Sequence, residues 1–448
     1  MKLWDKNIDT DKLVLAFTTG RDPEFDPLIA QWDIMGSMAH IIMLAETGLV
    51  GQEDARRLLE SLTELYPAAL KGEYLLEPGM EDIHSQVESD LTKKLGEPGK
   101  RIHTGRSRND QVLLDMKLFL REEIFEITSN TGQLFQTLIS LSDKYKDILI
   151  PGYTHMQVAM PSSFGLWFAS YAEALSEDLM IMKGAYDFIN QNPLGSAAGY
   201  GSSFPIDREM TTKLLGFRDL HINSVNAQMA RGRSELFTSF GISALATTLA
   251  RLAMDAVLFM NQNFGFISFP DHLTTGSSIM PHKKNPDVLE LIRGKSNLLA
   301  QLPGQISALT GNLPSGYHRD LQLLKESIIP AIIDLNSCLN MMNLMMTNII
   351  INEQVLDDER YKYIFSVEQV NEKVKNGIPF RDAYKEVAQE IFSGRYRQGR
   401  EHRYTHLGSI GNPGNEKIRK KMESVIEQFA FVRKEKIFKE LSNYFEKQ

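Results

Sequence analysis

The sequence contains very little cysteine: Cys338 is the only one among its 448 residues. A single cysteine excludes an intrachain disulfide and any metal centre built from cysteine thiolates. Cys338 lies in a segment rich in methionine and other apolar residues, which predicts a buried side chain and not a nucleophile.

Long uninterrupted hydrophobic runs and blocks of positive charge are also missing. The most apolar stretch, 328–355, is broken by Asp334 and several asparagines, which argues against a membrane span. The first residues are polar and contain no signal-peptide core, so we expect a cytoplasmic protein with no membrane partner. The net charge is −8, and no run of lysine and arginine offsets it, which argues against a nucleic-acid partner.

Several common catalytic motifs are absent as well. The sequence has no glycine-rich phosphate loop, no His-Glu-x-x-His, no Gly-x-Ser-x-Gly and no convincing dinucleotide-binding fingerprint. The enzyme classes that depend on these motifs are therefore not indicated.

What the sequence does contain is helical periodicity. Three shorter helices are predicted at 33–44, 54–66 and 81–95. Five long helices are predicted at 112–146, 161–190, 235–261, 287–309 and 328–351, with Pro303 expected to kink or interrupt the fourth. Since no period-two run exceeds a few residues, we expect an all-α protein with a central bundle of five long helices.

Changes in composition divide the chain into three predicted domains. These are an N-terminal helical domain (1–105), a central long-helix bundle (106–357) and a small C-terminal helical domain (358–448). The segment 235–261 is apolar nearly all round, so it should be buried on all sides. One thin bundle cannot easily bury such a helix, which predicts that the bundle continues across a subunit interface.

Two polar clusters precede long helices in the first half of the chain. Residues 103–111 place Ser107, Arg108 and Asn109 at a helix start, where arginine can bind a carboxylate and asparagine an amine. Residues 151–157 place His155 beside the Thr154 hydroxyl at a predicted loop-to-helix junction, suited to general acid–base chemistry. The plainer alternatives are a capped, charged helix start and a histidine bound to backbone carbonyls.

A third cluster spans 274–287, where a glycine and two serines form a flexible turn ahead of a helix start. Asn285 suits an N-cap, Pro286 the first helical position and Asp287 the first turn. Hydroxyls, lysines and free backbone N–H groups together predict an anion site, and a solvated basic helix start is the alternative.

The fourth cluster spans 317–325. Tyr317, Gln322 and Lys325 offer a phenol, an amide and a cation to a polar substrate. An ordinary amphipathic helix start is the alternative.

Taken together, these strings resemble the fumarase/aspartase superfamily of lyases. Gly276-Ser277-Ser278-Ile279-Met280-Pro281-x-Lys283-x-Asn285 is similar to the signature loop of that superfamily. Within it, the strings at 81–84, 103–112 and 151–157 are most similar to the argininosuccinate lyase family.

The resemblance implies reversible cleavage of argininosuccinate to arginine and fumarate by anti β-elimination through an aci-carboxylate carbanion, without metal or organic cofactor. It also implies a three-domain α protein whose five central helices join those of three other subunits, giving a homotetramer with active sites shared between chains. Two alternatives remain: elimination of fumarate from a related N-substituted succinyl-amine, and a non-catalytic structural homologue.

The resemblance also implies roles for individual residues. Ser277 matches the catalytic base, Lys283 a group that stabilises the carbanion, and His155 with its carboxylate partner Glu290 the proton donor to the leaving nitrogen. Positions that match substrate-binding or site-framing residues are His84, Ser107, Arg108, Asn109, Thr154, Ser278, Asn285, Tyr317, Gln322 and Lys325. The segments 18–24 and 223–233 depart from the family pattern, which leaves the amine half of the substrate open.

Overall fold

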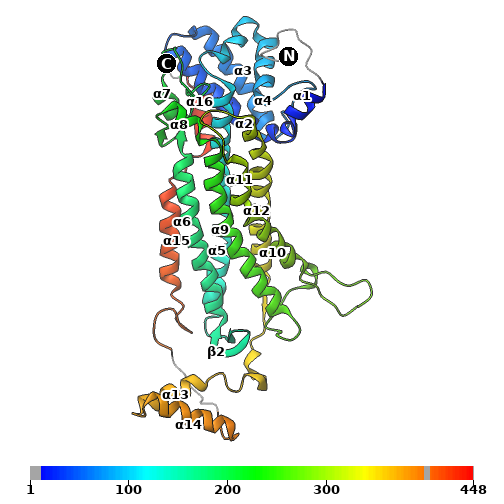
Figure 1. The fold of residues 1–448 in the computed structure, drawn as a ribbon, viewed down its shortest axis with the longest axis vertical. Coiled ribbons are helices and arrows are strands. Elements are labelled where there is room, and N and C mark those ends of the chain that lie inside the picture. The colour runs from blue at the N-terminus through cyan, green and yellow to red at the C-terminus, as the bar shows by residue number, and fades with distance from the viewer. Residues whose placement is uncertain (1–11, 398–403, 447–448) are drawn as a thin grey trace.

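The computed structural model describes residues 12–397 and 404–446, which form an elongated, mostly helical molecule (Figure 1). An N-terminal group of helices lies at one end, long helices run down the middle, and a small pair of helices lies at the other end. The expected all-α fold is confirmed.

The N-terminal group consists of α1 (Lys12–Thr19), α2 (Asp22–Glu46), α3 (Gln52–Leu70), α4 (Ile83–Leu95) and the 3-10 helix η1 (Glu97–His103). The three helices predicted here are all present. The predicted start at residue 33 was wrong, because α2 begins at Asp22. Pro23 stands in the first turn, where a proline has no helical N–H partner to lose, whereas Pro27 lies inside the helix. This earlier start brings Asp22 and Asp26 onto the helix.

The long helices are α5 (Arg108–Lys144), α6 (Phe164–Ile189), α9 (Ala230–Met260), α10 (Asp287–Leu299), α11 (Leu302–Thr310) and α12 (Leu324–Thr347). The fourth predicted helix is thus two helices, and Pro303 stands in the first turn of the second, as the expected interruption. α5 packs on α6 and α12, and α9 packs on α6 and α10. The buried apolar side chains of the bundle form one core with those of the N-terminal group.

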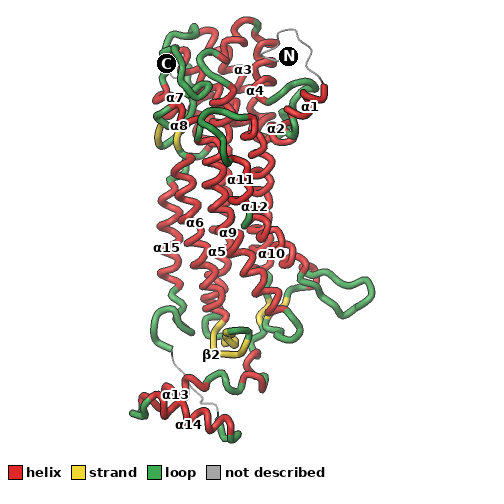
Figure 2. Tube along the Cα trace, viewed as in Figure 1, coloured by secondary structure: helices red, strands yellow, loops and turns green. Residues whose placement is uncertain are grey.

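Short elements connect these helices. They are α7 (Arg208–Leu214), α8 (Ser224–Gln228), the 3-10 helices η2 (Asp271–Leu273), η3 (Arg319–Leu323), η4 (Val355–Asp357) and η5 (Glu359–Tyr361), and six strands. The strands form three two-stranded sheets: β1 (Leu149–Thr154) with β2 (Gln157–Ser163) antiparallel, β3 (Gln191–Asn192) with β4 (Asp219–Leu220) parallel, and β5 (Ile267–Ser268) with β6 (Ile350–Ile351) antiparallel. Figure 2 shows the β1–β2 hairpin at the end of the bundle remote from both termini.

The C-terminal region does not form the single cap that we expected. Only α13 (Ser366–Lys375) and α14 (Phe380–Phe392) form a small unit, with Val370, Ala383 and Val387 as its core. The chain then returns: α15 (Asn415–Phe429) packs on α6 and α5, and α16 (Lys434–Ser442) packs on α2, α3 and α7. The sequence predicted a helical region here, but neither the bounds of its helices nor their packing partners.

Helix α9 is only partly buried within one chain, so the predicted burial on all sides would need a second subunit. Phe240 and Met254 remain 49% and 44% exposed. By length and composition alone, α2, α9 and the segment 319–347 are apolar enough to cross a membrane, but α2 is largely covered by the rest of the chain. Cys338 is buried, as predicted.

Close packing at the start of α6 gives a testable prediction. A Cβ on Gly165 would lie 2.4 Å from the Cα of Lys146, so we expect Gly165→Ala to destabilise the protein by about 1–3 kcal/mol. A Cβ on Gly184, also in α6, would meet nothing within 4 Å, so Gly184→Ala is the matched control. Urea unfolding at fixed protein concentration measures both, and equal midpoints would contradict the assigned packing.

Candidate active site

A cleft of about 90 Å³ lies where the N-terminal group of helices meets the adjacent end of the long-helix bundle. Six predicted site residues line it: His84, Arg108, Asn109, Tyr317, Gln322 and Lys325. Five further residues complete the lining: Asp22, Asp26, Asp82, Val112 and Arg319. Two of the four sequence clusters, separated by about half of the chain, are therefore brought to one place.

Helix caps position side chains on both sides of the cleft, on α5 of the bundle and on α4 of the N-terminal group. Ser107 caps α5, accepting a hydrogen bond from the Asn109 amide at 3.2 Å, and Asp110 completes a capping box. Within this chain, the Ser107 hydroxyl therefore acts as a helix cap, which is the alternative interpretation given above for this position. Asp82 caps α4 by accepting a hydrogen bond from the Ser85 amide at 2.8 Å, which fixes the first turn that carries His84.

His84 is held between two buried carboxylates. Its Nδ1 lies 2.8 Å from Asp33 Oδ1 on α2 and 3.6 Å from Asp115 Oδ2 on α5. Burial opposes charge on the ring, but the Asp33 and Asp115 carboxylates outweigh it and raise the pKa of His84 to about 9. These three side chains also have donor atoms within 4.8 Å of one another, the spacing of a metal site. When the His84 ring is protonated, the ion pair with these carboxylates balances its charge, and the positively charged imidazolium lines the cleft.

This raised pKa predicts how stability depends on pH. The pKa of a histidine is about 6.5 in the unfolded chain and about 9 here, so the stabilisation is complete below the lower value and lost as pH rises through the higher one. We expect the unfolding free-energy difference between wild type and His84→Gln to shrink by about 3 kcal/mol between pH 6 and pH 10. Urea titrations of the two proteins measure this difference, and His272→Gln, at an exposed histidine, is the control. A constant difference would refute the ion pair.

The two arginines of the cleft already have carboxylate partners. Arg108 lies 3.1 Å from both Glu81 and Asp82, and it donates a hydrogen bond to the Ser85 hydroxyl at 2.7 Å. Arg319 lies 3.2 Å from Glu81. An anionic substrate would therefore compete with Glu81 and Asp82 for these guanidinium groups.

Sequence reasoning missed the partners of Lys325. Its ammonium lies 2.5 Å from Asp22 and 2.6 Å from Asp26, so it is a compensated ion and not the free cation that we expected. The four-residue spacing of the two aspartates was the available signal, because it places them on one face of a helix. Nearby, the Gln322 side-chain amide donates a hydrogen bond to the Tyr317 hydroxyl at 2.7 Å, and burial raises the pKa of Tyr317.

Thr154 and His155 lie away from this cleft, at the exposed tip of the β1–β2 hairpin. His155 and Met156 form its two-residue turn with φ values of 53° and 59°, the left-handed conformation that hairpin turns require. The expected loop-to-helix junction at this point is therefore wrong: the helix α6 begins only after β2. Non-glycine residues with positive φ carry backbone strain, which is often found at functional sites.

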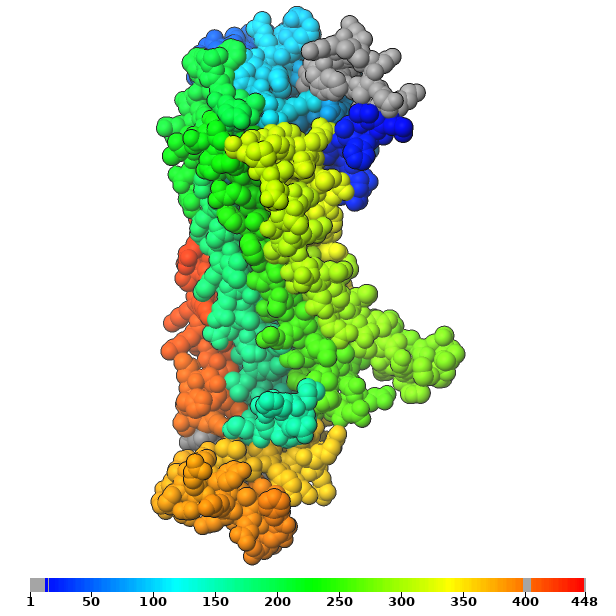
Figure 3. All heavy atoms as spheres, in the orientation of Figure 1, coloured from blue at the N-terminus to red at the C-terminus, as the bar shows by residue number. Residues whose placement is uncertain are grey.

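The signature loop projects from the side of the bundle, in the lighter green part of Figure 3. Thr275 and Asn285 pair as an antiparallel bridge that closes the loop, and Ser277 Oγ accepts a hydrogen bond from the Met280 amide at 3.2 Å. The predicted N-cap is wrong, because Asn285 belongs to this bridge and α10 starts after Pro286 without a side-chain cap. The turn that we expected ahead of this helix is present as a loop before α10.

A groove of about 550 Å³ lies at the base of the loop. Lys283, Asn285 and Glu290 line it together with residues at the end of α9, whereas Ser278 is exposed on the loop. The Glu290 carboxylate lies 3.9 Å from Arg293, and among the described residues it makes no contact with His155. One chain therefore presents the predicted site residues in three separate places: the cleft, the hairpin tip and the loop.

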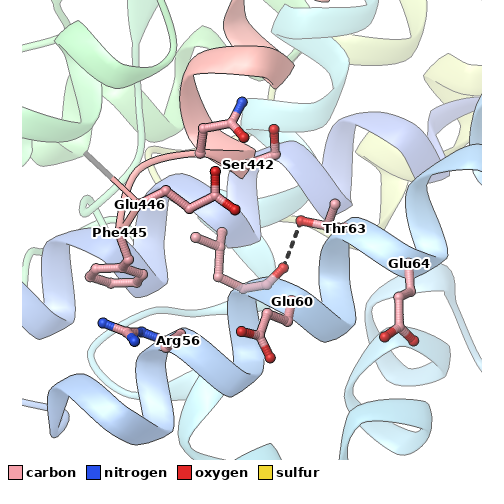
Figure 4. Close-up of a pocket in the computed structure, with 9 residues that line it drawn as sticks. Arg56, Glu60, Thr63, Glu64, Ser442, Phe445 and Glu446 are labelled. Carbon is pink, nitrogen blue, oxygen red and sulfur yellow. Dashed lines mark hydrogen bonds between the residues drawn. The ribbon is translucent and has the colours of Figure 1, made fainter. Parts of the chain in front are cut away.

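Another hollow, of about 600 Å³, lies between α3 and α16 (Figure 4). Arg56, Glu60, Glu64 and Glu446 give it mixed charge. None of the predicted site residues lines it.

Comparison with known proteins identifies the family. A family described as Lyase matches residues 6–299. Argininosuccinate lyase of Parabacteroides distasonis is 54% identical over 98% of this chain and 99% of its own, and that of Bacteroides fragilis is 53% identical over 96% of both. The protein belongs to the argininosuccinate lyase family.

More distant members and solved structures agree with this assignment. The argininosuccinate lyase of Thermotoga neapolitana is 39% identical over 87% of this chain and 98% of its own. The structure of EDDS lyase in complex with formate has a TM-score of 0.76 at 20% identity, covering 98% of this chain and 93% of that one. A fumarate lyase:delta crystallin from Brucella melitensis, with cobalt bound, has a TM-score of 0.70 at 15% identity, covering 92% and 95%. These structures establish the fold that the argininosuccinate lyase family shares with other lyases.

Proposed function

We propose that this protein cleaves argininosuccinate reversibly to arginine and fumarate by anti β-elimination through an aci-carboxylate carbanion. The observation that carries the proposal is its 54% identity with an argininosuccinate lyase along nearly the whole of both chains. On the same grounds we propose a cytoplasmic enzyme that acts on a small-molecule substrate, needs no metal or organic cofactor, and has no nucleic-acid or membrane partner.

In the proposed reaction, Ser277 removes a proton from the succinyl carbon next to a carboxylate. The electron pair left on that carbon makes the carboxylate a dianion, which Lys283, Asn285 and the start of α10 stabilise. The same positive field would activate the serine, because its hydroxyl is a poor base at its normal pKa. The pair then forms the double bond of fumarate while the carbon–nitrogen bond breaks. His155, which would pair with Glu290 of another subunit, gives a proton to the departing guanidine nitrogen.

We further propose that three chains of a homotetramer assemble each site. The separation of the cleft, the hairpin tip and the loop on one chain supports this, since no single chain brings Ser277, His155 and His84 together. Exposed apolar side chains on three bundle helices also support it, because burial against other subunits would remove them from water. These side chains are Phe240, Met254, Leu291, Leu298, Ile333 and Leu344.

The proposal is tested by ultraviolet absorbance of fumarate after mixing the protein with argininosuccinate. Release of fumarate together with one equivalent of arginine would support it. Release only from a different N-substituted succinyl-amine would overturn the assigned substrate and retain the elimination. Absence of fumarate from every such compound would favour a non-catalytic structural homologue.

A further inference from the structure

Helix α5 carries a fully buried lysine that pairs with no carboxylate in the described part of the chain. Lys117 is 0% exposed, and its Nζ atom lies 2.9 Å from the Gln191 carbonyl oxygen and 3.3 Å from His221 Nδ1. Glu235, whose charge acts on Lys117, is paired with Arg231 at 3.3 Å instead. A buried ammonium without its own carboxylate is costly, so the protonation state of this amine matters.

The side chains that follow Lys117 fix the direction of each hydrogen bond. An arginine can only donate, so the Asn226 atom that lies 3.4 Å from Arg233 Nη1 is the side-chain oxygen. The Nδ2 group of the same amide then donates to His221 Nε2 at 2.8 Å. A neutral imidazole that accepts at Nε2 carries its proton at Nδ1 and donates there. Lys117 can accept this bond only as a neutral amine.

The charged groups around this chain also favour neutral partners. Burial lowers the pKa of Lys117 to about 7, with Glu235 opposing the shift and Arg233 adding to it. Burial, with the neighbouring basic groups including Arg208, lowers the pKa of His221 to about 4. The ring is therefore neutral in the range where the amine of Lys117 gains or loses its proton.

The chain ends beside the kink at the start of α9, and this kink reaches the cleft. Arg231 and the residue after it have non-helical backbone angles. The Arg231 guanidinium donates a hydrogen bond to the Leu321 carbonyl oxygen at 3.0 Å, in η3. The next residue of η3, Gln322, lines the cleft. Arg233 lies two residues after Arg231, so its bond to the α8 side chain helps to hold the kink in place.

We propose that Lys117 acts as a neutral hydrogen-bond acceptor that, through His221 and Asn226, positions the kink of α9 and with it the η3 side of the cleft. A proton on Lys117 would reverse the chain, because an ammonium can only donate to His221. The ring would then donate from Nε2, which turns the Asn226 amide over and sets its NH2 group against the guanidinium of Arg233. The bond that anchors the kink is lost, and substrate binds more weakly. This effect on binding rests on the proposed function, whereas the hydrogen-bond chain does not.

The experiment measures KM for argininosuccinate at pH 6 and pH 8.5 in wild type and in Asn226→Asp. Charging Lys117 should raise the wild-type KM at pH 6 by about 3- to 10-fold, the effect of one lost hydrogen bond. A carboxylate accepts from His221 and Arg233 at once, so Asn226→Asp satisfies the chain in either direction. Its ratio of KM at pH 6 to KM at pH 8.5 should therefore be about 3- to 10-fold smaller than that of wild type.

The matched control is Asn223→Asp, at the exposed cap of the same short helix α8. It makes the same change from amide to carboxylate, and the Asn223 side chain accepts a hydrogen bond from the Asn226 backbone N–H at 3.0 Å without joining the chain. Either residue caps a helix well, so Asn223→Asp should keep the wild-type ratio. The comparison of the two variants separates this chain from other groups that titrate in the active site.

A variant with a fixed charge tests the origin of the effect. Lys117→Arg is charged at both pH values, so its KM at pH 8.5 should rise by about 3- to 10-fold, and adding Asn226→Asp should restore it. Nitrogen NMR of histidine-labelled protein reads the same chain without substrate. His221 should carry its proton at Nδ1 in wild type at pH 8.5 and at Nε2 in Lys117→Arg. If Lys117→Arg fails to fold, the two asparagine variants and the wild-type spectrum still decide.

Three results would overturn the inference. They are a wild-type KM ratio in Asn226→Asp, equal changes in Asn226→Asp and Asn223→Asp, and a His221 ring protonated at Nε2 in wild type at pH 8.5. Absence of fumarate release from argininosuccinate by wild type would instead overturn the proposed function. The NMR measurement needs no substrate, so it would still test the chain, and the two failures are distinguishable.

Discussion

Replacing Ser277 with alanine is expected to lower fumarate release by about 10²- to 10⁴-fold, the usual contribution of a positioned proton acceptor. Substrate binding and subunit assembly should persist. Among the residues that the structure describes, the Ser277 hydroxyl accepts hydrogen bonds only within its own loop, from the backbone N–H groups of Met280 and Ile279, so its loss disturbs no bundle contact there. Fumarate absorbance measures turnover, calorimetry measures binding, and gel filtration measures assembly.

The neighbouring Ser278 offers a matched control. It lies on the same loop and is exposed, so Ser278→Ala changes the loop by the same atom without removing the proposed base. Its loss of activity should be smaller and should affect KM more than kcat. A Ser277→Ala variant with a near-wild-type rate would remove Ser277 from the mechanism, and equal losses at both positions would indicate a general effect on the loop.

Mixing two inactive variants should restore activity. Ser277→Ala and His155→Asn alter different parts of the chain, the side loop and the hairpin tip. If each site takes these residues from different subunits, random assembly leaves about a quarter of the sites with both native side chains. Co-expression, or refolding of the mixed chains, followed by the fumarate assay measures the recovery.

The specificity of this recovery needs its own control. Each variant treated alone should stay inactive, and a doubly substituted chain mixed with either one should restore nothing. Failure of the two single variants to complement would place Ser277 and His155 of each site on the same chain, contrary to the proposed sharing.

The helices of this protein were predictable where a single periodic pattern determines them. The run of apolar residues that forms α5 has no proline, and the break at Pro303 follows from the lost hydrogen bond and the ring clash of that residue. The start of α2 was missed because prolines usually interrupt helices, whereas Pro23 lies in the first turn of this helix and Pro27 inside it. The β1–β2 hairpin was missed because its strands are short and contain Pro151 and Pro161, residues that usually interrupt strands.

The sequence predicted which residues form the candidate site better than it predicted their interaction partners. Local strings indicated His84, Arg108 and Ser277, since each belongs to a recognisable motif. The Lys325–Asp26 ion pair joins positions 299 residues apart, and no local pattern specifies such a contact. The same limit applies to Asp33 and Asp115 around His84, which come from two different helices.

The return of the chain to its starting end has a consequence for synthesis. Phe438 of α16 stacks on Tyr66 of α3 with ring centroids 3.8 Å apart, and Leu441 is fully buried. The ribosome makes proteins from the N-terminus at about 5–20 residues per second, so α2 and α3 leave it tens of seconds before α16 exists. During that interval, the apolar surface of α2 and α3 that α16 later covers stays exposed. A nascent chain stalled before α16 therefore presents this surface to chaperones, which a completed chain does not.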